Sequence, residues 1–240
     1  MKNYAIILAS GNGERTGLNI PKQYALISGK PVLEYSIETF QSNKNIDGII
    51  IVYNPNFQDK TEEIIQNNNY TKVIKLIKGG KTRQESSYNG VFSIDEKNAN
   101  VLIHDAARPF VSNEIINRCI NALKTHKAVN TVIKSSDTVI LVNDNNIITT
   151  VPDRNYVRRC QTPQCFDINL IKKAHNMSLN KQGFTDDCSL VLKNKLSKIY
   201  NVQGSNYNIK ITYLEDIETA ELILKNIREN YNYNSELSEK

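Results

Sequence analysis

The sequence lacks the features that would assign a chain to a membrane or an extracellular class. It contains no signal peptide and no apolar run of about 18 residues. Its four cysteines, Cys119, Cys160, Cys165 and Cys188, show no CxxC spacing. We therefore expect a cytoplasmic chain with reduced thiols and no membrane partner.

The chain also lacks blocks of like charge, internal repeats and a recognisable linker. It has 240 residues, 30 basic and 25 acidic side chains and a net charge of +5, with no run of five or more like charges. Charge spread in this way favours a small anionic substrate over nucleic acid. The length allows one large α/β domain or two small ones, and the absence of a linker favours one.

Strand and helix patterns alternate over residues 4–133. Short β-branched runs, typical of buried parallel strands, occur at 4–9, 48–53, 72–77, 100–105 and 128–133. Segments with apolar residues at helical spacing lie between them, at 31–42, 60–68, 83–94 and 113–126. This repeated βαβ order predicts a Rossmann-like α/β fold, in which helices cover both faces of a mostly parallel sheet.

The stretch 134–165 interrupts this alternation. Segments 137–142 and 147–151 flank the turn-forming residues 143–146 and predict a β-hairpin. Because the stretch is polar and rich in turns, we expect it to lie outside the core as an inserted arm for dimerisation. Further on, the patterns predict helices at 169–179, 189–196 and 215–229, a strand at 207–213 and a disordered polar tail at 229–240.

The loop after the first strand is built from small residues. It reads Ala9-Ser10-Gly11-Asn12-Gly13, and Arg15 and Lys22 follow it. Small residues let backbone N–H groups approach an anion closely, so this loop can hold phosphate groups. Its spacing matches neither a P-loop nor the dinucleotide fingerprint, which has a third glycine and a later acid. An ordinary tight turn with two solvated cations remains the alternative.

An acidic residue ends the strand at 100–105. Asp105 stands at the carboxyl end of that strand, the edge at which open α/β sheets bind ligands. A single carboxylate there can hold Mg²⁺ through one oxygen while phosphates and water supply the other ligands. The alternative is that Asp105 caps the next turn and pairs with Arg108.

Three further segments collect ligand-type residues. GGKTRQES (79–86) again places small residues after a strand, then a cation and the hydroxyl of Ser86. Lys210 lies inside a predicted strand, where lysine is unusual unless it is at an edge or reaches a ligand. The segment 153–166 concentrates three arginines beside a Thr-Pro turn. Taken singly, Lys210 reads as a solvated edge cation and 153–166 as an exposed basic loop.

Together these segments resemble one family. LASGNGERTG with PKQY, GGKTRQES, HDAARPFV, DTV, DRN followed by QTPQCF, TDDCSLV and NIKIT occur in the order and spacing of the polyol-phosphate cytidylyltransferases. This family includes enzymes for 2-C-methyl-D-erythritol 4-phosphate and for D-ribitol 5-phosphate. The resemblance covers roughly residues 3–225 and implies one nucleotidyltransferase domain over 1–228.

The resemblance implies a reaction and a set of site residues. CMP would pass from CTP to a small polyol phosphate, with release of pyrophosphate. Arg15, Lys22 and Lys210 would neutralise the triphosphate together with a Mg²⁺ ion on Asp105. The nucleotide pocket would be formed by Ala9, Ser10, Gly11, Gly13, Gly80, Ser86 and Ala106.

The resemblance also implies a homodimer whose arms enter the partner's sites. Asp105 and Arg108 would bind the acceptor, and Thr138 and Arg154 would reach its phosphate and hydroxyls from the neighbouring subunit. CTP and the polyol phosphate are then the expected small-molecule partners, without nucleic acid.

Departures from the family pattern bear on the substrate. Thr16 stands where many relatives have Met and Lys81 where several have an acid, so the nucleotide loop is expected to differ in detail. Methylerythritol-type enzymes usually carry basic residues where this chain has Ser136 and Ile140. We therefore predict D-ribitol 5-phosphate as the acceptor, giving CDP-ribitol for a cell-surface polymer. The alternative is 2-C-methyl-D-erythritol 4-phosphate in isoprenoid synthesis.

Two other classes make different predictions. A nicotinamide-dependent dehydrogenase requires an acid at the end of the second strand, where this chain has Val52-Tyr53-Asn54. A non-catalytic nucleotide-binding protein would keep the pocket but would not need Asp105 or Lys210.

Overall fold

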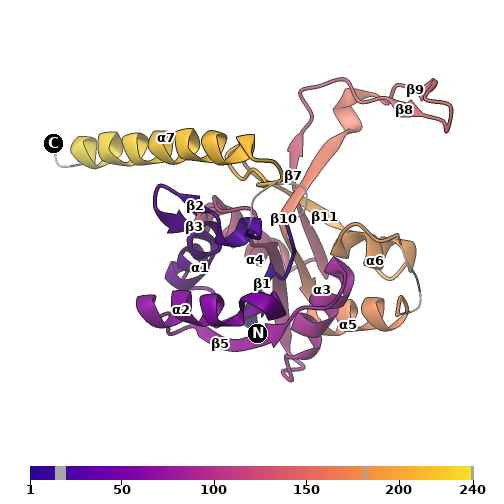
Figure 1. The fold of residues 1–240 in the computed structure, drawn as a ribbon. Coiled ribbons are helices and arrows are strands. Elements are labelled where there is room, and N and C mark those ends of the chain that lie inside the picture. Colours follow the sequence, from indigo (N-terminus) through magenta and orange to yellow (C-terminus); the bar gives the residue numbers. More distant parts are fainter. Residues whose placement is uncertain (14–19, 180, 182, 239–240) are drawn as a thin grey trace.

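The computed structural model describes residues 1–13, 20–179, 181 and 183–238. In this part of the chain seven strands form one sheet, in the order β11-β7-β10-β6-β1-β4-β5 (Figure 1). The strands are β1 (Lys2–Ala9), β4 (Gly48–Tyr53), β5 (Val73–Lys78), β6 (Ala99–Asp105), β7 (Ala128–Lys134), β10 (Arg158–Asp167) and β11 (Tyr200–Gln203). The first five confirm the strands predicted from β-branched runs.

The sheet is parallel except for one strand. β1 pairs in parallel with β4 and β6, β4 with β5, and β7 with β11. β10 lies between β6 and β7 and runs antiparallel to both. The predicted mostly parallel sheet is therefore confirmed, with one reversed strand in its interior.

Helices cover both faces of the sheet, as predicted. One face carries α1 (Val32–Ser42), α2 (Gln58–Asn68) and α4 (Asn113–Ala122), and the other α3 (Arg83–Phe92), α5 (Ile168–Asn176) and α6 (Asp187–Lys193). Along β1, Ala5 and Ile7 join the first core cluster, while Ile6 and Leu8 join the second. Successive side chains of a strand point to opposite faces, so a strand buried on both must be apolar throughout.

β10 corrects the prediction that all of 134–165 lies outside the core. Residues 161–166 are buried in the sheet, although half of them are polar. Hydrogen bonds explain this burial; for example, the Gln164 side chain donates to Asp186 Oδ2 at 2.7 Å. Pro163 sits at an irregularity in the β7–β10 ladder, where a missing N–H costs little. A polar composition therefore did not exclude a central strand.

The predicted β-hairpin of the arm is confirmed. β8 (Leu141–Val142) pairs antiparallel with β9 (Ile148–Thr150), and the hairpin stands away from the sheet (Figure 1). Large apolar side chains on this arm are exposed, namely Ile140, Leu141, Val142, Ile147, Ile148 and Val151. Whether the arm makes a dimer stays a prediction.

The strand predicted at 207–213 is wrong, because this segment is irregular and the edge strand is β11. Two hydrogen bonds account for the difference. Asn208 Nδ2 donates to Thr162 O at 2.9 Å, and Ile211 N donates to Ala107 O at 2.8 Å. These bonds tie the segment to the end of the sheet, so its backbone does not pair along a neighbouring strand.

The C-terminal helix, α7 (Glu215–Ser238), is longer than expected. Its Ala220, Ile223 and Leu224 pack with α1 and with the short hairpin of β2 (Leu26–Ile27) and β3 (Lys30–Pro31). The helix extends into the tail 229–240, and no glycine or proline within 215–238 interrupts it; the disorder of that tail stays a prediction.

Among the described helices, none combines the length and the apolar character needed to cross a membrane. The assignment of residues 1–228 to one domain stays a prediction.

Candidate active site

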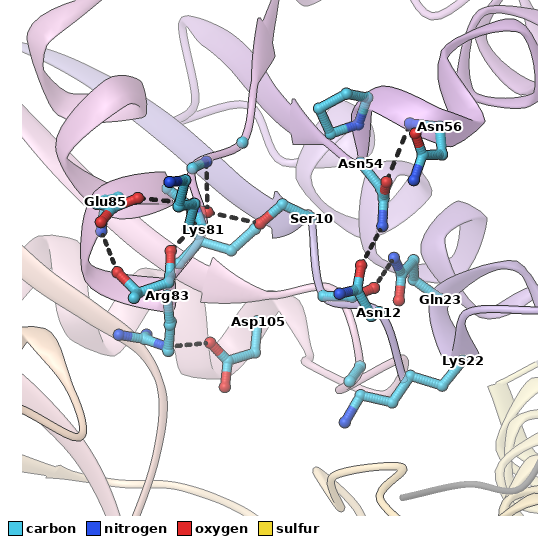
Figure 2. Close-up of a pocket in the computed structure, with 18 of the residues that line it drawn as sticks. Ser10, Asn12, Lys22, Gln23, Asn54, Asn56, Lys81, Arg83, Glu85 and Asp105 are labelled. Atoms are coloured by element: carbon cyan, nitrogen blue, oxygen red, sulfur yellow. Dashed lines mark hydrogen bonds and ion pairs between the residues drawn. The ribbon is translucent and has the colours of Figure 1, made fainter. Parts of the chain in front are cut away.

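A cavity of about 590 Å³ opens at the carboxyl ends of β1, β4, β5 and β6. This is the edge at which ligands bind in open α/β sheets. Figure 2 shows Arg83 and Asp105 on one side of the cavity and Asn12 and Lys22 on the other. The loops that follow the four strands thus converge on one hollow; the motifs had singled out the loops after β1, β5 and β6, but not the one after β4.

Gln23 fixes the first loop. This residue belongs to the short 3-10 helix η2 (Lys22–Tyr24) and is 2% exposed. Its side-chain amide donates to Ala9 O at 2.7 Å and to Gly11 O at 2.8 Å. The Pro-Lys-Gln segment therefore closes against the small-residue loop and brings Lys22 to the cavity wall.

Two serines connect the loops that follow β1 and β5. Ser10 Oγ donates to Ser86 Oγ at 2.7 Å, and Gly80 N donates to the same oxygen at 3.1 Å. A Cβ on Gly79 would collide with Ser10, and one on Gly80 would collide with Glu85. Glycine is needed at both positions, because the loop after β1 approaches Gly79 closely and the first turn of α3 approaches Gly80.

Asp105 is the most strongly held acid of the site. Its Oδ1 accepts from Arg83 Nε at 3.0 Å, and its Oδ2 accepts from Lys210 Nζ at 2.7 Å. Burial alone would raise the pKa of this carboxyl, but Arg83 and Lys210 hold it well below its usual range. The alternative pairing with Arg108 is not observed: among the described residues, the ion-pair partners of Asp105 are Arg83 and Lys210.

The backbone around Asp105 is supported by a buried histidine. Asp105 N donates to Thr162 Oγ1 at 3.1 Å, and this hydroxyl lies 3.0 Å from His104 Nδ1. The other ring nitrogen, Nε2, lies 3.0 Å from Arg108 O. Burial lowers the pKa of His104 to about 4, so the ring is neutral near pH 7. It therefore supports the loop through hydrogen bonds and adds no positive charge to the site.

A second, smaller cavity of about 200 Å³ adjoins the first. Arg108 lines it, and Nη1 of Arg108 donates to Asn208 O at 2.8 Å. Arg83, Asp105 and Lys210 line both cavities. Thr162, Thr185 and Asp186 also line this cavity, so three cations and two carboxylates share its wall.

The predicted nucleotide-binding residues divide into those that line the larger cavity and those that do not. Ser10, Gly11, Gly80 and Ser86 line the larger cavity. Ala9, Gly13 and Ala106 are described but do not, and Ala106 N donates to Leu8 O at 3.0 Å. These three residues shape the loops, with Ala107 at the wall in place of Ala106.

Two further predicted residues, Thr138 and Arg154, are not brought to Asp105 within one chain. Thr138 and Arg154 are exposed on the arm and line neither cavity. Arg15, like Thr16, lies outside the described residues. Their roles stay predictions.

The donor set limits how a metal could be held. The described residues contain no group of three or more His, Cys, Asp or Glu side chains able to hold an ion. Asp105 is a single carboxylate whose oxygens each retain a lone pair besides the ion pairs. It fits a Mg²⁺ that takes its other ligands from phosphates and water, and not a metal held by protein alone.

The structure adds residues that the sequence did not single out. Arg83 appeared as one cation inside GGKTRQES, and only the fold shows that it reaches Asp105. Asn12 and Asn54 face the larger cavity and are joined at 2.9 Å (Figure 2). Their positions after β1 and β4 were the available signal, since loops at this edge carry ligand contacts.

A sheet covered on both faces, with a cation-lined hollow at its carboxyl edge and two loops of small residues, defines a nucleotide-binding α/β protein. A family model described as "IspD: 2-C-methyl-D-erythritol 4-phosphate cytidylyltransferase" matches residues 4–226. The chain therefore belongs to the IspD family and is a CTP-dependent cytidylyltransferase. This confirms the family and the enzyme class predicted from the motifs.

Individual relatives agree with this assignment. A 2-C-methyl-D-erythritol 4-phosphate cytidylyltransferase of Clostridioides difficile is 40% identical over 91% of this chain and 92% of its own length. The crystal structure of 4-diphosphocytidyl-2C-methyl-D-erythritol synthase from Anaerococcus prevotii has a TM-score of 0.84 at 36% identity, covering 93% of this chain and 96% of that one.

A third relative carries a different name. The bifunctional ribulose 5-phosphate reductase/CDP-ribitol pyrophosphorylase Bcs1 of Haemophilus influenzae is 38% identical over 93% of this chain. The match covers 48% of that protein. Similarity to this chain therefore extends to a protein named for CDP-ribitol.

Proposed function

We propose that this enzyme transfers CMP from CTP to 2-C-methyl-D-erythritol 4-phosphate. The description of the family model and the name of the 40%-identical relative support this acceptor. They favour the substrate that the sequence motifs left as the alternative over D-ribitol 5-phosphate.

One observation carries the transfer reaction: the two cavities share a wall. Arg83, Asp105 and Lys210 line both of them. A nucleotide in the larger cavity and a phosphorylated acceptor in the smaller one would meet at these side chains. Holding two reactants in contact in this way is a large part of what an enzyme contributes to a bimolecular transfer.

The larger cavity suits CTP. Its loops present backbone groups and hydroxyls of small residues, which can follow a base and a phosphate chain closely. Lys22 and Lys210 line it from opposite ends of the sequence. They would balance the negative charge of the triphosphate.

The smaller cavity suits the acceptor phosphate. Nη2 of Arg83 and Nε of Arg108 are buried and have no hydrogen-bond partner in the described part of the chain. A buried donor without a partner is costly, and an anionic ligand would satisfy Nε of Arg108 if this guanidinium turns toward the cavity. Both arginines line this cavity beside Thr162 and Thr185.

The reaction needs no covalent intermediate with the protein. An oxygen of the acceptor phosphate forms a bond to the α-phosphorus of CTP, the bond from that phosphorus to the β-phosphate oxygen breaks, and pyrophosphate leaves. The phosphate nucleophile is already ionised at neutral pH, so no general base is required. Lys22 and Lys210 stabilise the charge that develops on the α-phosphate and the leaving group.

Mg²⁺ is part of this proposal, with Asp105 as the side chain that would hold it. When bound, the ion would neutralise phosphate charge. Lys210 and Arg83 keep Asp105 ionised, so the carboxylate is available as an oxygen ligand.

We also propose a homodimer in which each arm completes the partner's site. Six large apolar side chains of residues 140–151 are between 45% and 61% exposed, although the arm is otherwise polar. A second copy would cover this patch and bring the partner's Thr138 and Arg154 toward the acceptor. The cytoplasmic location stays a prediction.

D-Ribitol 5-phosphate is the second candidate acceptor, supported by the relative named for CDP-ribitol and by Ser136 and Ile140. The test incubates the enzyme with CTP, Mg²⁺ and each polyol phosphate separately, and measures pyrophosphate and the mass of the CDP product. We expect the methylerythritol acceptor to give the higher kcat/KM. A higher value for ribitol phosphate would reverse the assignment, and no pyrophosphate with either would reject both acceptors.

A further inference from the structure

A buried network lies behind Asp105, on the side away from Lys210. Arg83 is the first residue of α3, and the Thr82 side chain caps that helix by accepting from Glu85 N at 3.1 Å. From this fixed position Arg83 Nε contacts Asp105 Oδ1 at 3.0 Å, and Nη1 contacts Asp187 Oδ2 at 2.8 Å. One guanidinium therefore joins a carboxylate of the site to a carboxylate outside it.

Hydrogen bonds and burial also fix the position of Asp187. It is the first residue of α6, is 0% exposed and lines neither cavity. Its Oδ1 accepts from Ser87 Oγ, and its backbone N donates to Gln164 Oε1 at 3.0 Å. The side chain of Asp187 thus has bonding partners on α3, and its backbone is bound to β10.

Ser87, His175 and Asp187 contain the groups of a hydrolytic triad, but their surroundings exclude that role. Each is at most 1% exposed, so no substrate reaches the hydroxyl. The Asp187 carboxylate bonds to Ser87 and Arg83, while His175 Nε2 is 3.8 Å from it. Burial lowers the pKa of His175, which leaves Arg83 as the cation that balances Asp187.

We propose that Arg83 is a positioning residue for CMP transfer, which fixes the carboxylate of Asp105 against Lys210, and that Asp187 in turn fixes Arg83. The proposal rests on the proposed function, since Asp105 is the residue whose position matters. Lys210 and Arg83 hold opposite oxygens of Asp105, so the plane of the carboxylate is set by both.

The geometry requires arginine at this position. A guanidinium offers several donors in a rigid plane and can bridge two carboxylates, whereas an ammonium is a single point charge on a flexible stem. Arg83→Lys keeps the charge but cannot hold Asp105 and Asp187 together. Asp105 then loses one of its two fixed contacts, and a misplacement of about 1 Å can lower a rate by about 100-fold.

The test compares Arg83→Lys, Asp187→Asn and the double variant with the wild type. We expect kcat to fall by about 10- to 100-fold for Arg83→Lys and by about tenfold for Asp187→Asn, with the Kd of CTP changed less than about threefold. Because Asp187 acts through Arg83, the double variant should be no slower than Arg83→Lys alone. Gln84→Ala is the matched control: its side chain donates to Ser178 O at 3.1 Å, outside the site, and kcat should not change.

Other results would overturn the proposal. A wild-type kcat in Arg83→Lys would mean that the network serves stability alone. Losses that multiply in the double variant would mean that Asp187 does not act through Arg83. Should Asp187→Asn fail to fold, Ser87→Ala removes one contact of Asp187 and is expected to lower kcat about threefold; an unchanged kcat would contradict the second half of the proposal.

A readout without turnover separates this proposal from the proposed function. In a crystal structure of Arg83→Lys, the Asp105 carboxylate is expected to rotate away from the position that Arg83 and Lys210 together set in the wild type. If wild-type enzyme uses neither acceptor, the proposed function fails, but this rotation still supports the positioning role. An Asp105 that stays in place refutes that role even in an active enzyme.

Discussion

The sheet edge around Asp105 and the arm from 135 to 157 both carry predicted site residues, yet their physical settings are opposite. At the edge, Asp105 is 8% exposed and each carboxylate oxygen has a cationic partner within 3.0 Å. On the arm, Thr138 and Arg154 are exposed and line no described cavity. Asp105 thus has its ion-pair partners within one chain, whereas Thr138 and Arg154 have no cavity to line among the described residues.

This contrast separates two ways of building a site. Side chains at the edge are held by buried hydrogen bonds and ion pairs, so the fold of the single chain determines their geometry. Side chains on the arm have few contacts of their own, and the apolar residues beside them are exposed. The proposed dimer would supply what the arm lacks. Each of the following experiments tests one side of the contrast.

The largest effect is expected at Asp105. Asp105→Asn removes the charge that Arg83 and Lys210 hold and the proposed ligand of Mg²⁺, so turnover should fall by about 1000-fold or more. Pyrophosphate release measures this, with circular dichroism to show that the fold persists. Asp144→Asn makes the same chemical change in the exposed turn of the arm and should leave the rate unaltered. Near-normal activity of Asp105→Asn would remove this residue from the mechanism.

Lys210 should come next. Lys210→Met keeps the aliphatic stem but removes the ammonium that lies between the cavities, so kcat should fall by at least about 100-fold with little change in Tm. The exposed Lys124, replaced in the same way, provides the control. If Lys210→Met lowers Tm and leaves the rate per folded molecule unchanged, the residue stabilises the 207–213 segment and does nothing more.

Mixing two inactive variants tests whether the arm acts in the partner's site. Lys22→Ala damages the edge and Arg154→Ala damages the arm, so a mixed dimer should regain one intact site of its two. After random exchange of subunits in equal amounts, specific activity should reach about a quarter of the wild-type value. Mixed dimers that are shown to form but stay inactive would place Arg154 in its own chain's site, or in none.

The apolar patch of the arm should matter for association and not for folding. Ile148 is 56% exposed in the single chain, and burying such a side chain contributes about 1.5–3 kcal/mol. Ile148→Lys should therefore weaken dimerisation by about tenfold or more, as measured by analytical ultracentrifugation, with Tm unaffected at high protein concentration. An unchanged dimer Kd would mean that a different surface joins the subunits.

Among these tests of the edge and the arm, the smallest effect is expected at Ser86. Ser86→Ala removes the hydroxyl shared by Ser10 and Gly80, and the loss of one neutral hydrogen bond corresponds to about 1 kcal/mol, or about fivefold. The KM for CTP should rise by about that factor while kcat changes little. Ser189→Ala, which removes a hydroxyl on α6 outside both cavities, is the control. A fall in kcat with an unaltered KM would mean that Ser86 contributes to the transfer step.

The sequence predicted the parts of the fold whose residues are apolar and locally periodic. Strand 48–53 is an unbroken apolar run, and it became a fully buried strand. β10 was missed because its Gln161 and Gln164 are stable in the core only through partners on distant segments. The segment of Lys210 was predicted to be a strand from its alternation, although tertiary hydrogen bonds at Asn208 and Ile211 override that pattern.

In the candidate site, too, the sequence predicted residues with a local signal and missed those that depend on distant partners. Asp105 was predicted because a carboxylate at the end of a strand is a local signal. Arg83 was not, since its two partners are 22 and 104 residues away in sequence and no local pattern joins them. Residues whose function depends on such pairings become visible only when the chain has folded.

The antiparallel direction of β10 determines at which rim of the sheet the arm is inserted. β7 ends at Lys134, and Arg158, the first residue of β10, pairs directly beside it. The intervening loop therefore leaves and re-enters the sheet at the rim that carries Asp105. Had β10 run with its neighbours, the chain would have had to cross to the opposite rim before pairing, and any extension of that crossing would emerge far from the substrates. With this polarity, residues can be inserted, lost or exchanged between Lys134 and Arg158 while the register of the sheet is kept, so the enzyme can vary its outer contacts without rebuilding its core.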